Sequence, residues 1–322
     1  MTVDVGQVAA LSDRVVSQVE KAIVGKQTVL KMIMAAILSS GGHVLLEDYP
    51  GLAKTLIANS FATVLGLSFK RIQFTPDLLP GDITGGYVYD RSQNQFQLRK
   101  GPIFANIILA DEINRASPRT QSALLEAMQE YQVTLEGETM RLPEPFITIA
   151  TQNPIEYEGT FPLPEAQLDR FIMKLAVGYP SVEDERIILQ RRRDRRRDDF
   201  SLQPVTDMNR LLEIRQAVED VHLDGDIEEY IVQVVTRTRQ HRKVVVGASP
   251  RATLALLKLT RAWAAMHGRG YVLPDDVKLF ARPVLIHRLI LEPDLWTQRN
   301  AADDVVTDVL RTVPVPVVKE VE

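Results

Sequence analysis

The chain has no cysteine among its 322 residues, which excludes disulfide bonds and thiol chemistry. No segment approaches the roughly 20 consecutive apolar residues that a membrane-spanning helix requires, so we expect no membrane span. Residues 1–13 contain no basic region followed by an apolar core, and a signal peptide is therefore not expected. Together these absences predict a cytoplasmic protein.

Strong positive charge and metal-ligand spacing are also missing. The formal net charge of -4 argues against general nucleic-acid binding, and the five histidines show no spacing typical of a metal site. One basic run, residues 191–197, continues a helix that is expected to begin at Ser181 with Asp184 as its capping-box partner. A solvated or subunit-facing helix explains this run better than a nucleic-acid patch does.

A phosphate-binding turn is predicted between an apolar run, residues 43–47, and a helical run, residues 56–62. Gly51 allows backbone N–H groups to approach a phosphate, Lys54 supplies an ammonium for the β and γ phosphates, and Thr55 supplies a hydroxyl for Mg²⁺. The anion would lie at a helix N-terminus, where it is stabilised. An ordinary helix start is the alternative reading of the same residues.

A pair of acidic residues follows a second apolar run, residues 106–110. At the end of a strand, Asp111 can hold Mg²⁺ while Glu112 orients the attacking water. A strand that simply exits into solvent can also end in this way. Combined with Lys54 and Thr55, the acidic pair predicts hydrolysis of a nucleoside triphosphate.

Two residues depart from the usual glycines of such a turn. Ala53 precedes Lys54, which is a minor change, and Asp48 stands at the start of the turn. A carboxylate about 4 Å from a phosphate would cost on the order of 4 kcal/mol at an effective dielectric near 20. We therefore expect Asp48 to point away and to bond the local backbone, and weak nucleotide binding is the alternative.

These motifs, in this order, resemble those of MoxR-type AAA+ ATPases, and the resemblance extends from Ile23 to Val313. It implies an α/β fold, in which an AAA+ P-loop core with a parallel sheet and helices on both faces precedes an all-helical C-terminal lid. We expect residues 1–178 to form the core, with an N-terminal helix and two hairpin insertions. Residues 179–322 would form the lid and a short C-terminal tail.

The resemblance also implies roles for single residues. Asn153 would sense the γ phosphate, Arg251 would contact it from the lid, and Arg170 would be the arginine finger that enters a neighbouring subunit's site. Arg115 is a second candidate for that finger. The predicted catalytic residues are Glu112, Lys54, Asn153, Arg170 and Arg251, and the predicted metal ligands are Thr55 and Asp111. The predicted nucleotide-binding residues are Val24, Gly25, Asp48, Tyr49, Pro50, Gly51, Leu52, Ala53, Lys54, Thr55, Leu56, Asp111 and Arg251.

Two hairpins are predicted from alternating polar and apolar residues, at 83–99 and at 132–141. They resemble the insertions that line the central pore in this branch of AAA+ rings. Tyr87, Tyr89 and Phe96 would either contact a substrate in that pore or pack across the strands.

The resemblance implies an ATPase that uses ATP and Mg²⁺, assembles into a ring, expected to be a hexamer, and acts as a chaperone. Its partner would be a protein with a von Willebrand factor A domain or another client that it remodels, assembles or activates. Two alternatives remain open at this point. Asp48 suggests a nucleotide-dependent scaffold with little turnover, and the hairpins, which replicative helicases share, suggest a nucleic-acid remodeller.

Overall fold

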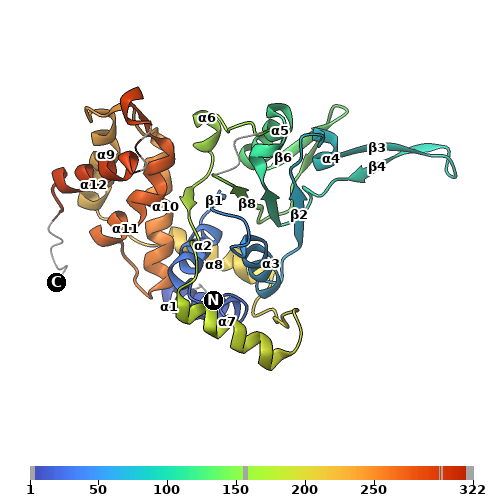
Figure 1. The fold of residues 1–322 in the computed structure, drawn as a ribbon, viewed down its shortest axis with the longest axis horizontal. Coiled ribbons are helices and arrows are strands. Elements are labelled where there is room, and N and C mark those ends of the chain that lie inside the picture. The colour runs from blue at the N-terminus through green and yellow to red at the C-terminus, as the bar shows by residue number, and fades with distance from the viewer. Residues whose placement is uncertain (1–3, 155–158, 297, 299, 317–322) are drawn as a thin grey trace.

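The computed structural model describes residues 4–154, 159–296, 298 and 300–316. Its centre is a parallel sheet with the strand order β2-β5-β8-β1-β9 (Figure 1). The strands are β1 (Val44–Glu47), β2 (Phe69–Gln73), β5 (Ile107–Asp111), β8 (Ile147–Gln152) and β9 (Met173–Leu175). Gln73 pairs with Asp111 and Glu47 with Gln152, so the carboxyl ends of these strands lie along one edge. The predicted parallel sheet is confirmed.

The inner part of the sheet is buried on both faces because the side chains of β1, β5 and β8 alternate between two apolar clusters. Leu46 and Leu109 belong to the cluster that includes residues of α2 (Gln27–Leu38) and α3 (Lys54–Val64). Leu45 and Ile108 belong to the opposite cluster, with residues of α5 (Pro118–Glu130). The N-terminal helix α1 (Val5–Val19) contacts both α2 and α3. Continuous apolar strands therefore fit a sheet that is covered on two sides.

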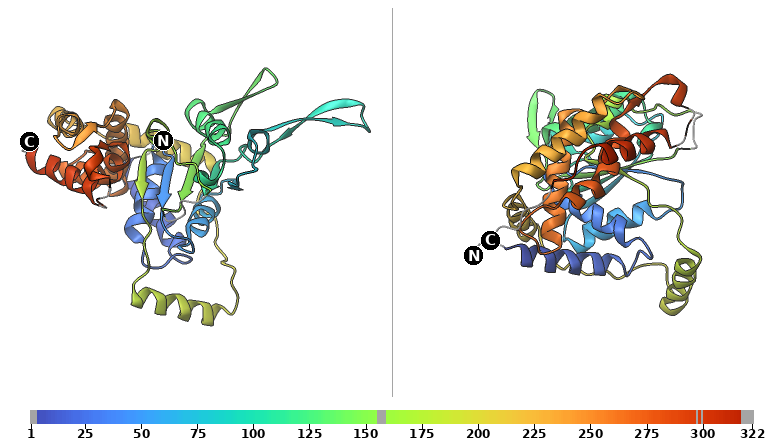
Figure 2. Two further views of the ribbon diagram at one scale, coloured as in Figure 1. Left: turned by 45° about the horizontal axis from the view of Figure 1, so that its top comes forward. Right: turned by 90° about the vertical axis from the view of Figure 1, so that its left-hand side faces the viewer.

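Both predicted hairpins are present, and the first projects far from the body of the molecule (Figures 1 and 2). It consists of β3 (Gly85–Asp90) and β4 (Gln95–Lys100), and the second consists of β6 (Gln132–Leu135) and β7 (Glu138–Arg141). The first strand begins later than the predicted residue 83, because Pro80 opens the short helix α4 (Pro80–Thr84). The hairpins lie close enough for Tyr87 Oη to donate to Glu138 Oε2 at 2.8 Å.

The aromatic residues of the first hairpin combine both expected features. Tyr89 and Phe96 lie directly opposite each other, with ring centroids 5.3 Å apart in an edge-to-face arrangement. Cross-strand packing is therefore present. Tyr89 nevertheless remains 47% exposed and Phe96 69% exposed, so this pair offers a contact surface away from the body.

The C-terminal region is helical, as predicted. Its helices are α8 (Met208–Glu219), α9 (Gly225–Arg239), α10 (Pro250–Met266), α11 (Pro274–Leu285) and α12 (Ala301–Thr312). It also contains a short antiparallel pair, β10 (Val244–Val246) with β11 (Ile290–Leu291), because a run of β-branched residues favours an extended chain. Two short helical turns, η2 (Ile286–Arg288) and η3 (Pro293–Leu295), also lie in this region. Two others, η1 (Ile113–Arg115) and α6 (Glu165–Leu168), lie earlier in the chain, among the strands of the parallel sheet.

The long helix α7 (Val182–Arg195) stands apart from the sheet and has no buried residue (Figure 2). Its Ser181–Asp184 capping box is present as predicted. Arg191 Nη1 donates to the backbone carbonyl of Glu20 at 2.6 Å, and the Arg195 guanidinium lies 4.0 Å from the centre of the Phe200 ring. Contacts within the chain thus engage part of the basic run, and whether the helix faces solvent or another subunit stays a prediction.

The C-terminal region packs on the N-terminal helices, since α10 contacts α1 and α2, and α8 contacts the same pair. A boundary at residue 178 remains a prediction. Within the part of the chain that the structure describes, no helix is long and apolar enough to cross a membrane.

Candidate active site

A pocket of about 400 Å³ lies at the carboxyl edge of the sheet. The sequence-predicted groups Lys54, Thr55, Asp111, Glu112 and Asn153 all line it, although they come from three separate segments. The full lining is Pro50, Gly51, Leu52, Ala53, Lys54, Thr55, Leu56, Arg71, Asp111, Glu112, Thr151 and Asn153. The site lies where the strand order reverses around β1 and β8, the usual ligand position in open α/β sheets.

The phosphate loop turns sharply between β1 and α3. Gly51 has φ 82° and Ala53 has φ 55°, both in the left-handed region, and α3 begins at Lys54. A non-glycine residue in this conformation costs roughly 1–2 kcal/mol, so Ala53 introduces more strain than a minor change would. Lys54 Nζ donates to the backbone carbonyls of Asp48 at 2.6 Å and Tyr49 at 3.2 Å, which closes the loop around the ammonium.

Asp48 points away from this pocket, in agreement with the expectation from sequence. Its Oδ1 accepts a hydrogen bond from the backbone N–H of Tyr49 at 2.8 Å, and its Oδ2 accepts one from the N–H of Gly178. Asp48 is buried and does not line the phosphate pocket. Its carboxylate therefore ties the start of the loop to the segment that follows β9 instead of facing a bound anion.

Asp111 ends β5 with both carboxylate oxygens occupied by side chains. Thr151 Oγ1 donates to Oδ1 at 2.7 Å. Arg71 donates to Oδ2 from Nε at 2.9 Å and from Nη2 at 2.7 Å. Sequence reasoning missed Thr151 and Arg71, since their importance depends on strand order.

Glu112 has the left-handed φ of 56°, which is a strained conformation of the kind found at functional sites. Its N–H donates to Thr151 Oγ1 at 2.8 Å, and its Oε2 accepts from Gln73 Nε2 at 2.7 Å. Arg115 Nη1 also donates to Oε2, at 3.0 Å. Arg115 thus contacts the acidic pair of its own chain, which weakens its case as a finger for a neighbour.

Val24 and Gly25, which were predicted to bind the nucleotide, do not line the phosphate pocket. Gly25 lies against the first turn of α7, where an added Cβ would come within 2.2 Å of the Asp184 carboxyl group. Nearby, Lys26 Nζ donates to the backbone carbonyl of Tyr179 at 2.8 Å. The Tyr179 ring stacks on Tyr49, with centroids 5.7 Å apart, and so connects this segment to the phosphate loop.

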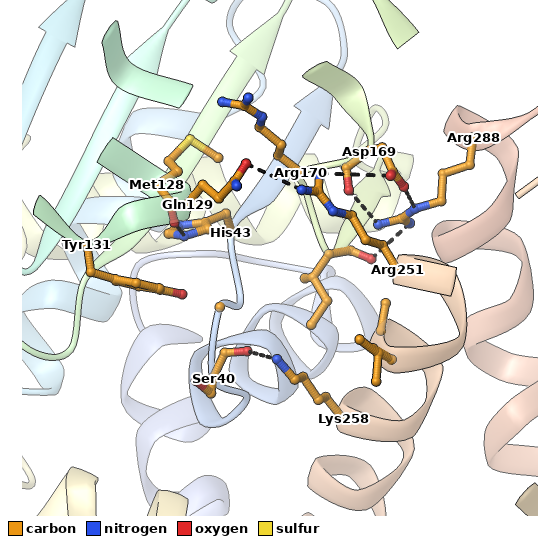
Figure 3. A pocket seen from close by; sticks show the side chains of 14 residues that line it. Ser40, His43, Met128, Gln129, Tyr131, Asp169, Arg170, Arg251, Lys258 and Arg288 are labelled. Carbon is orange, nitrogen blue, oxygen red and sulfur yellow. Dashed lines mark hydrogen bonds and ion pairs between the residues drawn. The ribbon is translucent and has the colours of Figure 1, made fainter. Parts of the chain in front are cut away.

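Arg170 and Arg251 line a second pocket of about 230 Å³, which we call the arginine pocket (Figure 3). It shares no lining residue with the phosphate pocket. Arg251 does not line the phosphate pocket of its own chain, and its contact with the γ phosphate stays a prediction. The packing of α10 against α1 and α2 places the start of α10 beside the end of α5 instead.

The arginine pocket is built around Asp169. Arg288 Nε donates to Asp169 Oδ1 at 2.7 Å, and Asp169 Oδ2 lies 3.9 Å from Arg251 Nη1 (Figure 3). Asp169 Oδ2 also accepts from Ser249 Oγ at 2.9 Å. Arg251 Nη2 also donates to Gln129 Oε1 at 3.3 Å. Burial, and then the nearby Arg251 cation, lower the pKa of the Arg170 guanidinium. Two cations held side by side favour an anion at this pocket.

Comparison with known proteins agrees with this architecture. Residues 43–173 match the ATPase family associated with various cellular activities, and residues 236–309 match the AAA lid domain. Chaperone MoxR1 of Mycobacterium tuberculosis is 44% identical over 318 residues, which cover 96% of this chain and 83% of that protein. The chain belongs to the MoxR family of AAA+ ATPases.

Two further relatives of this MoxR-family chain are similar over their whole length. The protein YeaC of Bacillus subtilis is 47% identical over 307 residues, 95% of each chain. A crystal structure of a candidate ATPase from Cytophaga hutchinsonii superposes with a TM-score of 0.89 at 40% identity, covering 97% of both chains. The core and the lid of this chain are thus arranged as in that solved structure.

Proposed function

We propose that this MoxR-family chain binds ATP with Mg²⁺ and hydrolyses it inside a ring of identical subunits, with six subunits as the expected number. The observation that supports this proposal is the separation of the phosphate pocket from the arginine pocket. One chain carries the groups for binding and water activation in one pocket, and Arg170 and Arg251 in another. A head-to-tail ring brings the two unlike surfaces of adjacent subunits together.

In this mechanism Lys54 neutralises the β and γ phosphates, and the N–H groups at the start of α3 bind the phosphate oxygens. The Thr55 hydroxyl and the Asp111 carboxylate are oxygen ligands of the kind that suits Mg²⁺, and they line the same pocket. The metal, when bound, would offset phosphate charge. Glu112 would orient the attacking water and accept its proton, with Asn153 beside the γ phosphate.

Arg170 and Arg251 of the neighbouring subunit would then stabilise the charge that develops on the transferred phosphoryl group. Arg170 lies next to Asp169, whose carboxylate is fixed by Arg288 and Ser249. Loss of the γ phosphate would remove the anion that holds the two subunits in register. Hydrolysis would therefore change the contact between subunits and drive mechanical work.

The work would be remodelling, assembly or activation of client proteins in the cytoplasm, with a von Willebrand factor A domain protein as the expected partner. The relative MoxR1 is named a chaperone, which supports this assignment. The projecting β3–β4 hairpin supports it as well, because the exposed Tyr89 and Phe96 present aromatic surface away from the body. Such surface suits contact with a polypeptide.

Mixing of variants tests the shared site. Glu112→Gln keeps both arginines but lacks the water-orienting group, whereas Arg170→Ala keeps a complete phosphate pocket. Each variant alone should release almost no phosphate. In equal mixture about a quarter of the contacts in randomly assembled rings combine an intact phosphate pocket with an intact Arg170, so about a quarter of native turnover should return.

The control mixes Glu112→Gln with Lys54→Ala. Both changes lie in the phosphate pocket, so every site carries one defect and no activity should return. A mixture of Arg115→Ala with Glu112→Gln compares the two candidates for the arginine finger. Turnover should return in the mixture only for the arginine that acts on the neighbouring subunit's site. A silent mixture of Glu112→Gln with Arg170→Ala, in rings of confirmed size, would refute action of Arg170 across the interface.

A further inference from the structure

Arg71 brings a positive charge to the metal side of the phosphate pocket. It lies on β2, the strand at the edge of the sheet, and residues two apart on a strand share a face, so Arg71 and Gln73 point the same way. β2 pairs with β5, the strand that ends in Asp111. The Arg71 side chain is 49% exposed and lines the pocket beside Lys54 and Thr55.

The contact with Asp111 is specific to one oxygen. Thr151 holds Oδ1, and both Nε and Nη2 of Arg71 donate to Oδ2, at 2.9 Å and 2.7 Å. Nη2 also donates to Gln73 Oε1 at 2.5 Å. Asp111 itself is largely enclosed, with a side chain only 12% exposed. The guanidinium is thus oriented by a second acceptor while it covers the remaining oxygen of Asp111.

Because Thr151 already donates to Oδ1, Oδ2 is the Asp111 oxygen on which a cation would have to bind. Mg²⁺ needs oxygen ligands in a nearly ideal octahedron at roughly 2.0–2.1 Å, and an oxygen that accepts two N–H bonds does not meet that need. A guanidinium nearby also repels a divalent cation. Arg71 therefore has to leave Asp111 before the metal can be bound there.

We propose that Arg71 is a positioning residue that occupies Asp111 and so lowers the affinity of the nucleotide site for Mg²⁺. This inference rests on the proposed function, because it assigns a metal role to Asp111. In the native chain, Mg²⁺ that enters with nucleotide would replace the Arg71 guanidinium on Asp111. Removal of the Arg71 charge should make metal binding tighter without improving nucleotide binding in the absence of metal.

The test uses the full chain and a fluorescent ADP analogue as the probe. The dissociation constant of this analogue is measured with excess Mg²⁺ and with a chelator. The constant in chelator divided by the constant in Mg²⁺ gives the coupling between metal and nucleotide. Partly exposed ion pairs contribute about 0.2–1 kcal/mol, so Arg71→Gln should raise this ratio by about 1.4- to fivefold. Arg71→Lys keeps the charge but loses the planar fork, and should give a smaller increase.

Lys70→Gln is the matched control. It removes the same charge from the neighbouring position of the same strand, on the face that points away from Asp111, and should leave the ratio unchanged. Thermal unfolding checks that all variants are folded. Equal ratios for the native chain and Arg71→Gln would overturn the proposal, and so would weaker binding of Arg71→Gln in chelator, since Arg71 would then be a phosphate ligand. Absence of nucleotide binding by the native chain would instead overturn the proposed function, and this inference with it.

Discussion

Arg288 connects the C-terminal region to the loop that carries Arg170, and its removal should have a large effect. Its side chain is 2% exposed and its guanidinium donates to Asp169 Oδ1 at 2.7 Å and to the backbone carbonyl of Phe171 at 2.6 Å. Further donors reach the carbonyls of Asp169, Ile172 and Val284. Burial lowers the pKa of Arg288, and the hydrogen bond that Arg288 donates to Asp169 opposes that shift.

The substitution Arg288→Met keeps an unbranched side chain of similar reach and removes every donor. It leaves the Asp169 carboxylate, which is mostly enclosed, with Ser249 as its remaining close partner. Breaking a buried ion pair by removing one member costs about 3–5 kcal/mol. An unfolding entropy of about 2.1 cal/mol/K per residue gives about 1.5 °C per kcal/mol for 322 residues, so the midpoint of thermal unfolding should fall by roughly 5–7 °C.

Circular dichroism at a fixed protein concentration measures the midpoint, and Arg186→Met serves as the matched control. Arg186 pairs with Glu183 at 3.5 Å, but both side chains are more than two-thirds exposed, at 74% and 71%. Its loss should change stability by no more than about 0.5 kcal/mol. Equal shifts for the two variants would refute the claim that Arg288 holds the two regions together. Arg288→Met should also lower turnover, because the loop next to it carries Arg170.

Three further predictions concern single residues. Asp48→Ala leaves the N–H groups of Tyr49 and Gly178 without their acceptor, so the free energy of unfolding measured in urea should fall by about 1–3 kcal/mol. ATP affinity, measured in a competition titration, should stay within about threefold of the native value. A gain of about tenfold in affinity would contradict the outward position of Asp48. Ala53→Gly relieves roughly 1–2 kcal/mol of left-handed strain, and the added entropy of the unfolded chain costs about 0.5–1 kcal/mol. The stability of this variant should therefore equal or slightly exceed that of the native chain. A marked loss of stability would contradict the claim that Ala53 is strained. Burial lowers the pKa of His43 from 6.5 to about 4, so the unfolded chain takes up this proton first and stability falls as pH drops from 6.5 towards 4. In His43→Gln, the slope of stability against pH between 5 and 6.5 should be smaller by up to about 1.4 kcal/mol per pH unit, and an unchanged slope would exclude His43 as its source.

The sheet and the phosphate loop could be predicted because local patterns determine them. Apolar runs mark the buried strands, and the polar residues that follow them fall at the carboxyl edge whichever strands are neighbours. Lys54, Thr55, Asp111 and Glu112 therefore meet in one pocket, as expected. The Ser181–Asp184 capping box and the two hairpins depend on residues only a few positions apart, and both features were predicted, although the first hairpin begins at Gly85 and not at residue 83.

Arg71 and Gln73 could not be identified in the same way, because their role depends on β2 lying next to β5. Nothing in the alternation of residues 69–73 specifies that neighbour. The position of Arg251 has a similar origin, since it is set by the packing of α10 on α1 and α2 over a long sequence separation. Asp48 is intermediate: its contact with Tyr49 is local, but its contact with Gly178 depends on β9 lying beside β1.

The charges of the phosphate pocket are balanced from within the chain. Lys54 is held by two carbonyls, Asp111 by Arg71 and Thr151, and Glu112 by Gln73 and Arg115. Under the proposed function, nucleotide and metal would displace some of these partners, so part of their binding free energy would go into the exchange and lower the net affinity. Among these partners, Arg71 and Gln73 lie on β2, Arg115 lies in η1 after β5, and Thr151 lies on β8. Because the contacts on Asp111 and Glu112 share Thr151 and the β2 face, occupation of one carboxylate should alter the other, which would link metal binding to the readiness of Glu112 for hydrolysis.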